Sequence, residues 1–334
     1  MKAPITLLLT FVTMVVHSQN TVEKYVREGI QYHDAGDYRS ALEAYQHALY
    51  LNPRSSLANY EMAMTYSVIN EYDSALKYAD IVIELNDNSL IPAYIVKGNT
   101  LDDLGHPHKA IKTYKTGLRR VGKHHLLYYN MALTHFTLKD HESTEKALVK
   151  AIKNNPTHGS SHLLLGQLLF TRDQPVQSLL ALYYFLLLEP NTNRSAGAYQ
   201  LVSTQLTGSA ERDGNNINIL VPASKNKKED FSAAALMLSM FGAMNLSDEN
   251  KDQTPEEQFV TNTKSFFTIL GELKGKKKRG LWWKFYVPFF YDLARTDHLE
   301  TYCYYISQSS NQNAITWLDS HIDRIEALDQ WLRE

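Results

Sequence analysis

Cysteine and long apolar runs are both scarce in this sequence. Cys303 is the only cysteine among 334 residues, so no intrachain disulfide can form. A chain of this length can depend on its apolar core instead, because it is far above the size at which small domains need cross-links. The mostly apolar stretch Ile5–Val16 has twelve residues, whereas a membrane-spanning helix needs about 20. The sequence therefore predicts a mature protein without a transmembrane span.

An excess of basic charge is also missing. The formal net charge is −2, and it is spread evenly along the chain. Residues 22–192 carry 17 basic and 18 acidic side chains, and residues 193–334 carry 16 and 18. Domains that bind nucleic acid normally have a strongly basic surface. We therefore expect no nucleic-acid partner.

The common catalytic and cofactor motifs are absent as well. The chain contains no Gly-x-Gly-x-x-Gly, no phosphate-loop lysine motif, no Gly-x-Ser-x-Gly and no His-Glu-x-x-His. The paired histidines, such as His124-His125, fall near repeat edges, where solvated turn residues are expected. Cys303 lies among tyrosines, and such an apolar setting keeps a thiol protonated. We expect no catalytic residue, no metal site and no cofactor, so the sequence does not predict an enzyme.

The first residues have the pattern of a secretory signal peptide. Met1-Lys2 is a short basic start, Ile5–Val16 is the apolar segment, and Val16-His17-Ser18 offers a small-residue cleavage site before Gln19. No cysteine follows the apolar segment, so the usual lipid-attachment signal is missing. We predict that residues 1–18 are removed and that the protein is exported, either periplasmic or secreted. The short signal peptide favours a bacterial source.

The main positive feature is a repeat with a period of 34 or 35 residues, present five times between residues 22 and 192. Such a period is typical of stacked helix pairs. Two positions of every copy hold small residues, which predicts a close crossing of the two helices. The first position holds Gly29, Ala63, Gly98, Ala132 and Gly166, and the second, on the facing helix, holds Ala41, Ala75, Ala110, Thr144 and Ser178.

The ends of the copies also fit helix pairs. Pro53, Pro156 and Pro190 close three of the copies, because proline cannot continue the hydrogen bonding of a helix. One helix pair cannot bury its apolar face alone, so successive copies must stack.

This pattern resembles the tetratricopeptide repeat family, whose consensus places small residues and aromatics at these offsets. The resemblance covers about half of the chain, and it implies an all-α solenoid of five helix-turn-helix repeats. Copies four and five depart from the consensus, with Thr144 and Ser178 for alanine and Leu148 and Leu182 for tyrosine. The five copies span residues 22–55, 56–90, 91–124, 125–158 and 159–192.

Members of this family bind protein segments in a concave groove lined by the first helices of the copies. Each carried-over position can equally be a surface residue or an inter-repeat contact. The set is aromatic and mildly acidic, and it lacks the lysine clamp of chaperone-binding relatives, so it implies a partner with apolar anchors and some basic character. The candidates are Tyr60, Met64, Asn99, Asp102, Asp103, Tyr129, Phe136, Gln167 and Phe170, with His33 and Asp34 in the first copy.

Residues 193–334 lack the repeat, and we expect them to form a packed helical C-terminal domain. Thr254-Pro255-Glu256-Glu257 has the cap, proline and glutamate of a helix start. Leu179–Leu188 has no polar face, and a helix that is apolar all round is buried all round. The C-terminal half should therefore cover it and form one continuous body with the repeats. The expected elements are helices near Arg194–Leu206, Phe231–Met244, Thr254–Lys274 and Asn313–Leu332, another helix from Asp297, and a strand or extended link at Asn215–Val221.

The stretch Lys274–Tyr291 allows two interpretations. Its basic run, Lys274 to Arg279, and the seven aromatics of Leu281–Tyr291 suit a surface that contacts a glycan or the membrane periphery. Alternatively, a charged loop leads into a core helix bent at Pro288, and the near absence of polar residues favours this burial.

The leading functional hypothesis is therefore an exported, non-enzymatic scaffold that binds a protein segment in its groove. A cell-envelope glycan-binding module that uses the aromatic C-terminal half is the alternative. An enzyme whose site is assembled from the C-terminal helices is the third.

Overall fold

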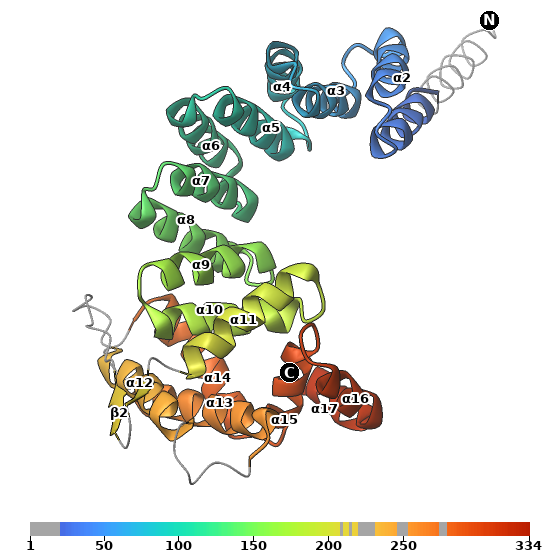
Figure 1. Ribbon diagram of the computed structural model, residues 1–334. Helices are drawn as coiled ribbons and strands as arrows, with labels where there is room; N and C mark the ends of the chain where they lie inside the picture. Colours follow the sequence, from blue (N-terminus) through green and yellow to red (C-terminus); the bar gives the residue numbers. More distant parts are fainter. Residues whose placement is uncertain (1–20, 208–209, 214–215, 220–230, 246–252, 274–278) are drawn as a thin grey trace, which may run out of the picture. The chain divides into compact units, whose positions relative to one another are not determined.

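The computed structural model describes residues 21–207, 210–213, 216–219, 231–245, 253–273 and 279–334 (Figure 1). The expected signal peptide, residues 1–18, and the four lysines of the basic run between Lys274 and Lys278 lie outside the described residues. The chain divides into two compact units, unit 1 (Met1–Asn154) and unit 2 (Asn155–Glu334). Each unit is described by itself.

The described part of unit 1 consists of consecutive antiparallel helix pairs, and the expected helix-turn-helix architecture is confirmed (Figure 1). Each helix packs on the next along the chain. A helix over residues 21–34 comes first. It is followed by α2 (Tyr38–Leu51), α3 (Ser56–Val68), α4 (Tyr72–Leu85), α5 (Leu90–Asp103), α6 (Pro107–Val121), α7 (His125–Thr137) and α8 (His141–Asn154).

The small repeat position does lie at a close helix crossing, but the residue opposite it differs from the expected one. A Cβ atom placed on Gly98 would overlap the ring of Tyr114, one turn beyond Ala110, and a Cβ on Gly29 would overlap the ring of Tyr45. Ala110 and Ala41 are themselves fully buried. The glycine therefore makes room for a tyrosine ring that passes across the first helix.

The turn inside each helix pair uses one left-handed residue, always at the same repeat position. The φ angles are 80° at Gly36 and 75° at Gly105, and 61°, 57° and 55° at Asn70, Lys139 and Asp173. Glycine adopts this conformation without a steric cost, whereas other L-residues strain against their own Cβ atom. The same turn therefore recurs in all five copies, although only two of them use glycine.

Unit 2 contains the fifth helix pair and all the later helices, together with one short antiparallel hairpin. Strand β2 lies within the segment expected to be a strand or an extended link. Among the described helices, none combines the length and apolar character that crossing a membrane requires. The elements are α9 (Gly159–Thr171), α10 (Pro175–Leu188), α11 (Asn193–Thr207), β1 (Ala210–Asp213), β2 (Asn216–Ile219), α12 (Ser232–Asn245), α13 (Pro255–Glu272), the π-helix η2 (Trp282–Tyr286), α14 (Val287–Ala294), α15 (His298–Ser307), α16 (Gln312–Ser320) and α17 (Ile322–Arg333).

The core of unit 2 is built around α10. Tyr183 is fully buried, and its ring lies 4.9 Å from the ring of Phe267 and 6.0 Å from that of Phe290. Its hydroxyl is 2.8 Å from the Thr263 hydroxyl, and its carbonyl oxygen accepts a 2.9 Å hydrogen bond from Tyr302. Helices α9, α11, α12 and α15 and the π-helix all contact α10. The expectation that the C-terminal half covers this helix is confirmed.

Two expectations for the C-terminal half need correction. The single last helix expected from Asn313 to Leu332 is two helices, α16 and α17, which break at His321. The Ser320 hydroxyl donates to the carbonyl groups of Thr316 and Trp317, and such side-chain bonds offer the backbone an alternative to the helix. The aromatic stretch also opens with a π-helix, whose wider turn precedes Pro288 in the first turn of α14.

Candidate functional site

The first helices of the repeats form the inner face of unit 1. Helix α3 contacts α5, and α5 contacts α7, in addition to the contacts within each pair. Among the described second helices, α4 and α6, or α6 and α8, make no contact of comparable extent. The first helices are therefore closer together than the second helices, and unit 1 curves toward them.

A ladder of hydrogen bonds between side chains joins the first helices. The His33 ring lies 2.8 Å from the Thr65 hydroxyl, and the Ser67 hydroxyl lies 3.2 Å from that of Thr100. One copy further on, Thr134 donates a 2.6 Å bond to Asp102. The three threonines occupy one repeat position and are buried. Their regular spacing was the sequence signal for this ladder, and reasoning from groove positions alone missed it.

Several of the expected groove residues take part in packing. Asp102 is half-buried as a ladder acceptor, and Asn99 accepts a 2.6 Å hydrogen bond from the Tyr114 hydroxyl. Tyr60 and Met64 are partly buried against the cluster of Ala63, Ala79 and Val96. These four side chains present only part of their surface to a partner.

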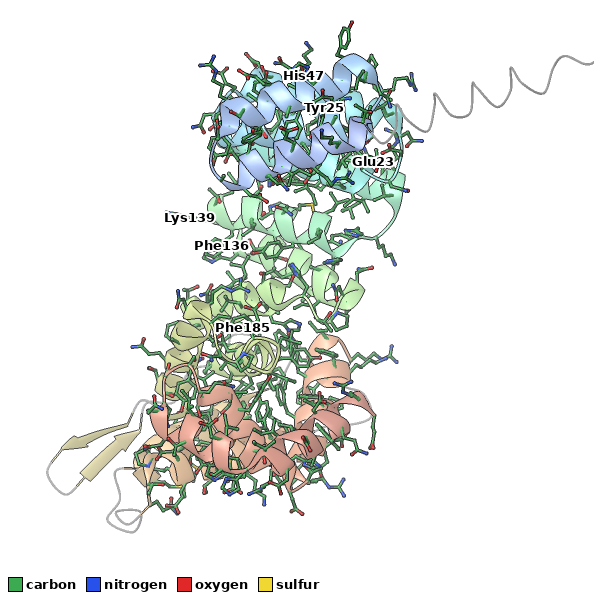
Figure 2. All side chains as sticks on the ribbon, turned by 90° about the vertical axis from the view of Figure 1, so that its right-hand side faces the viewer. Glu23, Tyr25, His47, Phe136, Lys139 and Phe185 are labelled. Atoms are coloured by element: carbon green, nitrogen blue, oxygen red, sulfur yellow. The ribbon has the colours of Figure 1, made fainter. Side chains whose placement is uncertain are left out.

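The other expected residues are more accessible. Phe136 is 38% exposed near the end of α7, where Figure 2 labels it beside Lys139. Asp103 is exposed and Tyr129 is half-buried on the same face of unit 1. Gln167 and Phe170 lie on α9 in unit 2, where both are exposed. The candidates from Tyr60 to Phe136 therefore belong to unit 1, and the last two belong to unit 2.

Exposed aliphatic side chains on the inner face were missed by the sequence reasoning. Leu57 and Val68 of α3 are each 46% exposed, and Leu133 of α7 is 36% exposed. Val68 and Leu133 occupy the repeat positions of Asp103 and Asn99, whereas Leu57 lies at a groove position where no other residue was expected. Reading every copy at every groove offset finds all three. With Phe136, they give the face large apolar side chains on α3 and α7, on either side of the more polar α5.

The carboxylates of this face are partly desolvated. Burial, with a further contribution from Asp34, raises the pKa of Glu61 to about 6. Burial and the neighbouring Asp102 likewise raise the pKa of Asp103. A carboxylate in such surroundings is stabilised by a nearby cation. The face can therefore accommodate apolar side chains together with basic ones.

Two groups that could support chemistry, His162 and Cys303, are buried in unit 2. His162 is buried in unit 2 between the Tyr286 hydroxyl at 2.6 Å and the Pro156 carbonyl at 2.8 Å. Burial lowers the pKa of His162 to about 4 and raises the pKa of the Cys303 thiol far above its usual range. Within the described residues, no cluster of three or more His, Cys, Asp or Glu side chains could hold a metal ion.

The aromatic stretch of unit 2 is part of the core. Trp282 and Trp283 are 3% and 2% exposed, and the ring of Trp283 stacks on Phe231 at 4.7 Å. Exposed tryptophans were the basis of the glycan-binding alternative, and of membrane contact through this segment. Their burial removes that support, and the interpretation as a core helix is confirmed.

Comparison with known proteins agrees with this architecture. Family models for the tetratricopeptide repeat match residues 26–89, 91–120 and 126–158. The chain is 24% identical to a TPR repeat-containing protein of Methanocaldococcus jannaschii over 139 residues. The aligned region is 42% of this chain and 24% of that protein. The chain is 32% identical to the small glutamine-rich tetratricopeptide repeat-containing protein 2 of Mycosarcoma maydis over 96 residues. That alignment includes 29% of this chain and 27% of that protein. The chain thus spans about a quarter of the length of these curated relatives.

Two solved structures are similar to parts of this chain. A thermophilic TPR protein of Thermus thermophilus aligns with a TM-score of 0.47 at 19% identity, over 54% of this chain and 98% of that one. PilW, described as a widely conserved type IV pilus biogenesis factor, aligns with a TM-score of 0.47 at 14% identity, over 72% of this chain and 98% of that one.

Proposed function

Since the chain belongs to the tetratricopeptide repeat family through residues 26–158, we propose that it is a non-enzymatic scaffold that binds a protein segment on the inner face of unit 1. The observation that carries the proposal is the exposure of large apolar side chains at the groove positions of α3 and α7. Isolated surface apolar residues are ordinary, but a set gathered on one face is typical of a binding site.

The proposed partner is an extended or helical segment with apolar anchors and at least one basic residue. Leu57, Val68, Leu133 and Phe136 supply apolar contact area, and aromatic anchors usually contribute most of the binding energy. Asp103 and Glu61 favour a partner cation because burial disfavours their charged forms when no counter-charge is near.

We also propose that the scaffold acts outside the cytoplasm, as a periplasmic or secreted protein. The support is the signal-peptide pattern of residues 1–18. The five-copy solenoid over residues 22–192, followed by a helical domain over 193–334, remains our proposed domain organisation. Unit 1 supplies the proposed binding surface, and within unit 2 the C-terminal helices pack on the fifth helix pair.

A display selection against the chain from Gln19 onward tests this function. Peptides selected by the protein should bind the Tyr129→Ala/Phe136→Ala variant at least about tenfold more weakly, which corresponds to about 1.4 kcal/mol. The thermal melt should stay nearly unchanged, because both side chains keep part of their surface in solvent.

Two control variants complete the test. Tyr50→Ala/Leu51→Ala removes two exposed apolar side chains from α2, away from the inner face, and should bind like the parent chain. Neutralising the basic residues from Lys274 to Arg279 should matter only at low salt, since added salt screens attraction between charges that are farther apart than about 10 Å. Loss of binding in the basic-run variant but not in the double variant of α7 would overturn the proposal.

A further inference from the structure

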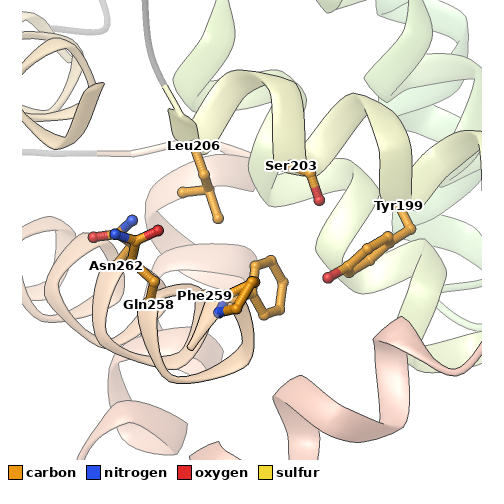
Figure 3. A pocket seen from close by; sticks show the side chains of 7 residues that line it. Tyr199, Ser203, Leu206, Gln258, Phe259 and Asn262 are labelled. Carbon is orange, nitrogen blue, oxygen red and sulfur yellow. The ribbon is translucent and has the colours of Figure 1, made fainter. Parts of the chain in front are cut away.

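Unit 2 contains a cavity of about 180 Å³ between α11 and α13 (Figure 3). Tyr199, Ser203 and Leu206 reach it from α11, at a spacing that puts them on one helix face. Gln258, Phe259 and Asn262 reach it from α13, with Pro255 beside them. Leu206 and Asn262 are 2% and 8% exposed, and Pro255 is exposed. The cavity therefore has a buried floor and an open rim.

Among the residues that the structure describes, no charged side chain lines this cavity. Glu256, the acidic neighbour of Pro255, accepts hydrogen bonds of 3.0 Å from Asn311 and 2.9 Å from Asn313. These amides, from the start of α16, hold the pKa of Glu256 below its usual value. An ionic ligand would lose its hydration without gaining a counter-charge, which is costly. The occupant must be uncharged.

The lining also sets the size and the hydrogen-bonding character of the occupant. A water molecule needs about 10–15 Å³ of such volume, so the cavity accommodates more than one or two waters, yet it is smaller than the 300–1,000 Å³ of typical ligand pockets. The side-chain amide of Gln258 can both donate and accept hydrogen bonds, whereas the Tyr199 hydroxyl interacts with Ser203 and Ser307. The ring of Phe259 lies 5.3 Å from that of Tyr199 and provides an apolar wall.

We propose that this cavity binds an uncharged carboxamide group. A primary amide is planar, it donates and accepts hydrogen bonds at one end, and it can pair reciprocally with the side-chain amide of Gln258. Its flat face suits the ring of Phe259, and a short aliphatic stem reaches it from the rim past Pro255. The group can come from a glutamine or asparagine side chain of a bound protein or from a free small amide. This site is independent of the inner face of unit 1.

Titrations of the chain from Gln19 onward, labelled on leucine methyl groups, test the site through the methyl signals of Leu206. Propionamide should shift these signals at millimolar concentration. Propionate and 1-propanol, which are matched in size, should bind at least about fivefold more weakly, the value of one net hydrogen bond. Gln258→Leu removes the lining amide and should reduce the affinity for propionamide by a similar factor. Gln200→Leu, the same change at an exposed position of α11 outside the cavity, should leave it unchanged.

A pair of peptides distinguishes the two sources of the amide. Acetyl-Gly-Gln-Gly-N-methylamide and acetyl-Gly-Met-Gly-N-methylamide share their backbone amides and have no primary amide at the C-terminus, so the glutamine side chain is the one primary amide that distinguishes them. Tighter binding of the glutamine peptide than of propionamide assigns the site to a protein side chain, and tighter binding of propionamide assigns it to a small molecule. The proposal is overturned if propionate or propanol binds as well as propionamide. Equal effects of Gln258→Leu and Gln200→Leu would overturn it too.

Discussion

At the scale of single residues, each repeat packs a small residue of its first helix against a side chain of its second helix, and the size of that second side chain varies from copy to copy. Gly29 and Gly98 face Tyr45 and Tyr114, and Gly166 faces Leu182. In the second copy the equivalent positions are Ala63 and Ala79, both fully buried. The sequence identified the small positions by their spacing. It did not identify the side chain opposite, because a tyrosine one turn away competes with the nearer alanine for the same space.

Gly98→Leu should destabilise unit 1 by about 1–3 kcal/mol or more, because the new side chain overlaps the Tyr114 ring. Gly98→Ala should act in the same direction. The double variant Gly98→Ala/Tyr114→Ala reproduces the alanine pair of the second copy. It should lose less free energy of unfolding than the two single variants lose together. The coupling should exceed about 0.5 kcal/mol. Helical circular dichroism during urea unfolding measures all four variants, and strict additivity of Gly98→Ala and Tyr114→Ala would mean that these two positions do not touch.

Lys139→Gly should stabilise unit 1 by up to about 1 kcal/mol. The left-handed conformation of Lys139 costs an L-residue about 1–2 kcal/mol, and glycine returns part of this gain through its larger unfolded-state entropy. Lys146→Gly is the matched control, because it makes the same change within α8, where glycine should cost about 1 kcal/mol. Thermal melts of the two variants should move in opposite directions; a shift of both to lower temperature would contradict the prediction.

At the scale of helices, the local sequence predicted where helices begin better than where they break. The capping box expected at Thr254 is present, with Glu257 donating its backbone N–H to Thr254 and accepting from the Thr254 backbone N–H. The break at His321 was not foreseen, because the apolar face of residues 313–332 stays in register across it. The π-helix was also missed, and its aromatics contact α9 and α10, which lie far away in the sequence. His162 shows this most directly, as its ring bonds the Tyr286 hydroxyl across 124 positions of sequence.

Unit 2 should lose stability as the pH falls from about 6.5 to about 4. A histidine in the unfolded chain takes up a proton near pH 6.5, whereas burial lowers the pKa of His162 to about 4. Between these values the unfolded state binds more protons, so the free energy of unfolding decreases as the pH decreases. His162→Gln should flatten this dependence.

Tryptophan fluorescence measures this effect in unit 2 alone, because all four tryptophans lie at or beyond Trp282. The control is His141→Gln, which changes an exposed histidine of unit 1 and should keep the pH slope of the parent chain. An unchanged slope in His162→Gln would assign the acid sensitivity to other groups.

At the scale of the whole molecule, the repeat period predicted the helix pairs, but it did not indicate where the chain divides. The division falls between Asn154 and Asn155, so the fifth pair belongs with the C-terminal helices. The second helix of this pair, α10, has no polar face. It carries leucines and aromatics all round, and the C-terminal helices cover them. For the candidate site, family offsets selected residues of the first helices. They did not separate Asn99 and Asp102, which bond neighbouring helices, from Phe136 and Asp103, which face solvent.

The protein recovered from its natural source should begin at Gln19 and lie outside the cytoplasm. The apolar segment Ile5–Val16 and the small residue Ser18 are the basis of this prediction. N-terminal sequencing after cell fractionation checks it, and replacing Leu8 and Leu9 with arginine should retain the chain in the cytoplasm. Met1 on the protein from the parent sequence would contradict export.

The ladder from His33 to Thr134 lies along the first helices only, and this gives unit 1 an anisotropic elasticity. Bending that spreads the second helices apart turns the pairs about the ladder and leaves its hydrogen bonds in place, whereas stretching along the stack must break them. Unit 1 should therefore bend easily but resist stretching along the stack of repeats. A partner on the inner face could then adjust how tightly the repeats close around it without changing the spacing between successive contacts.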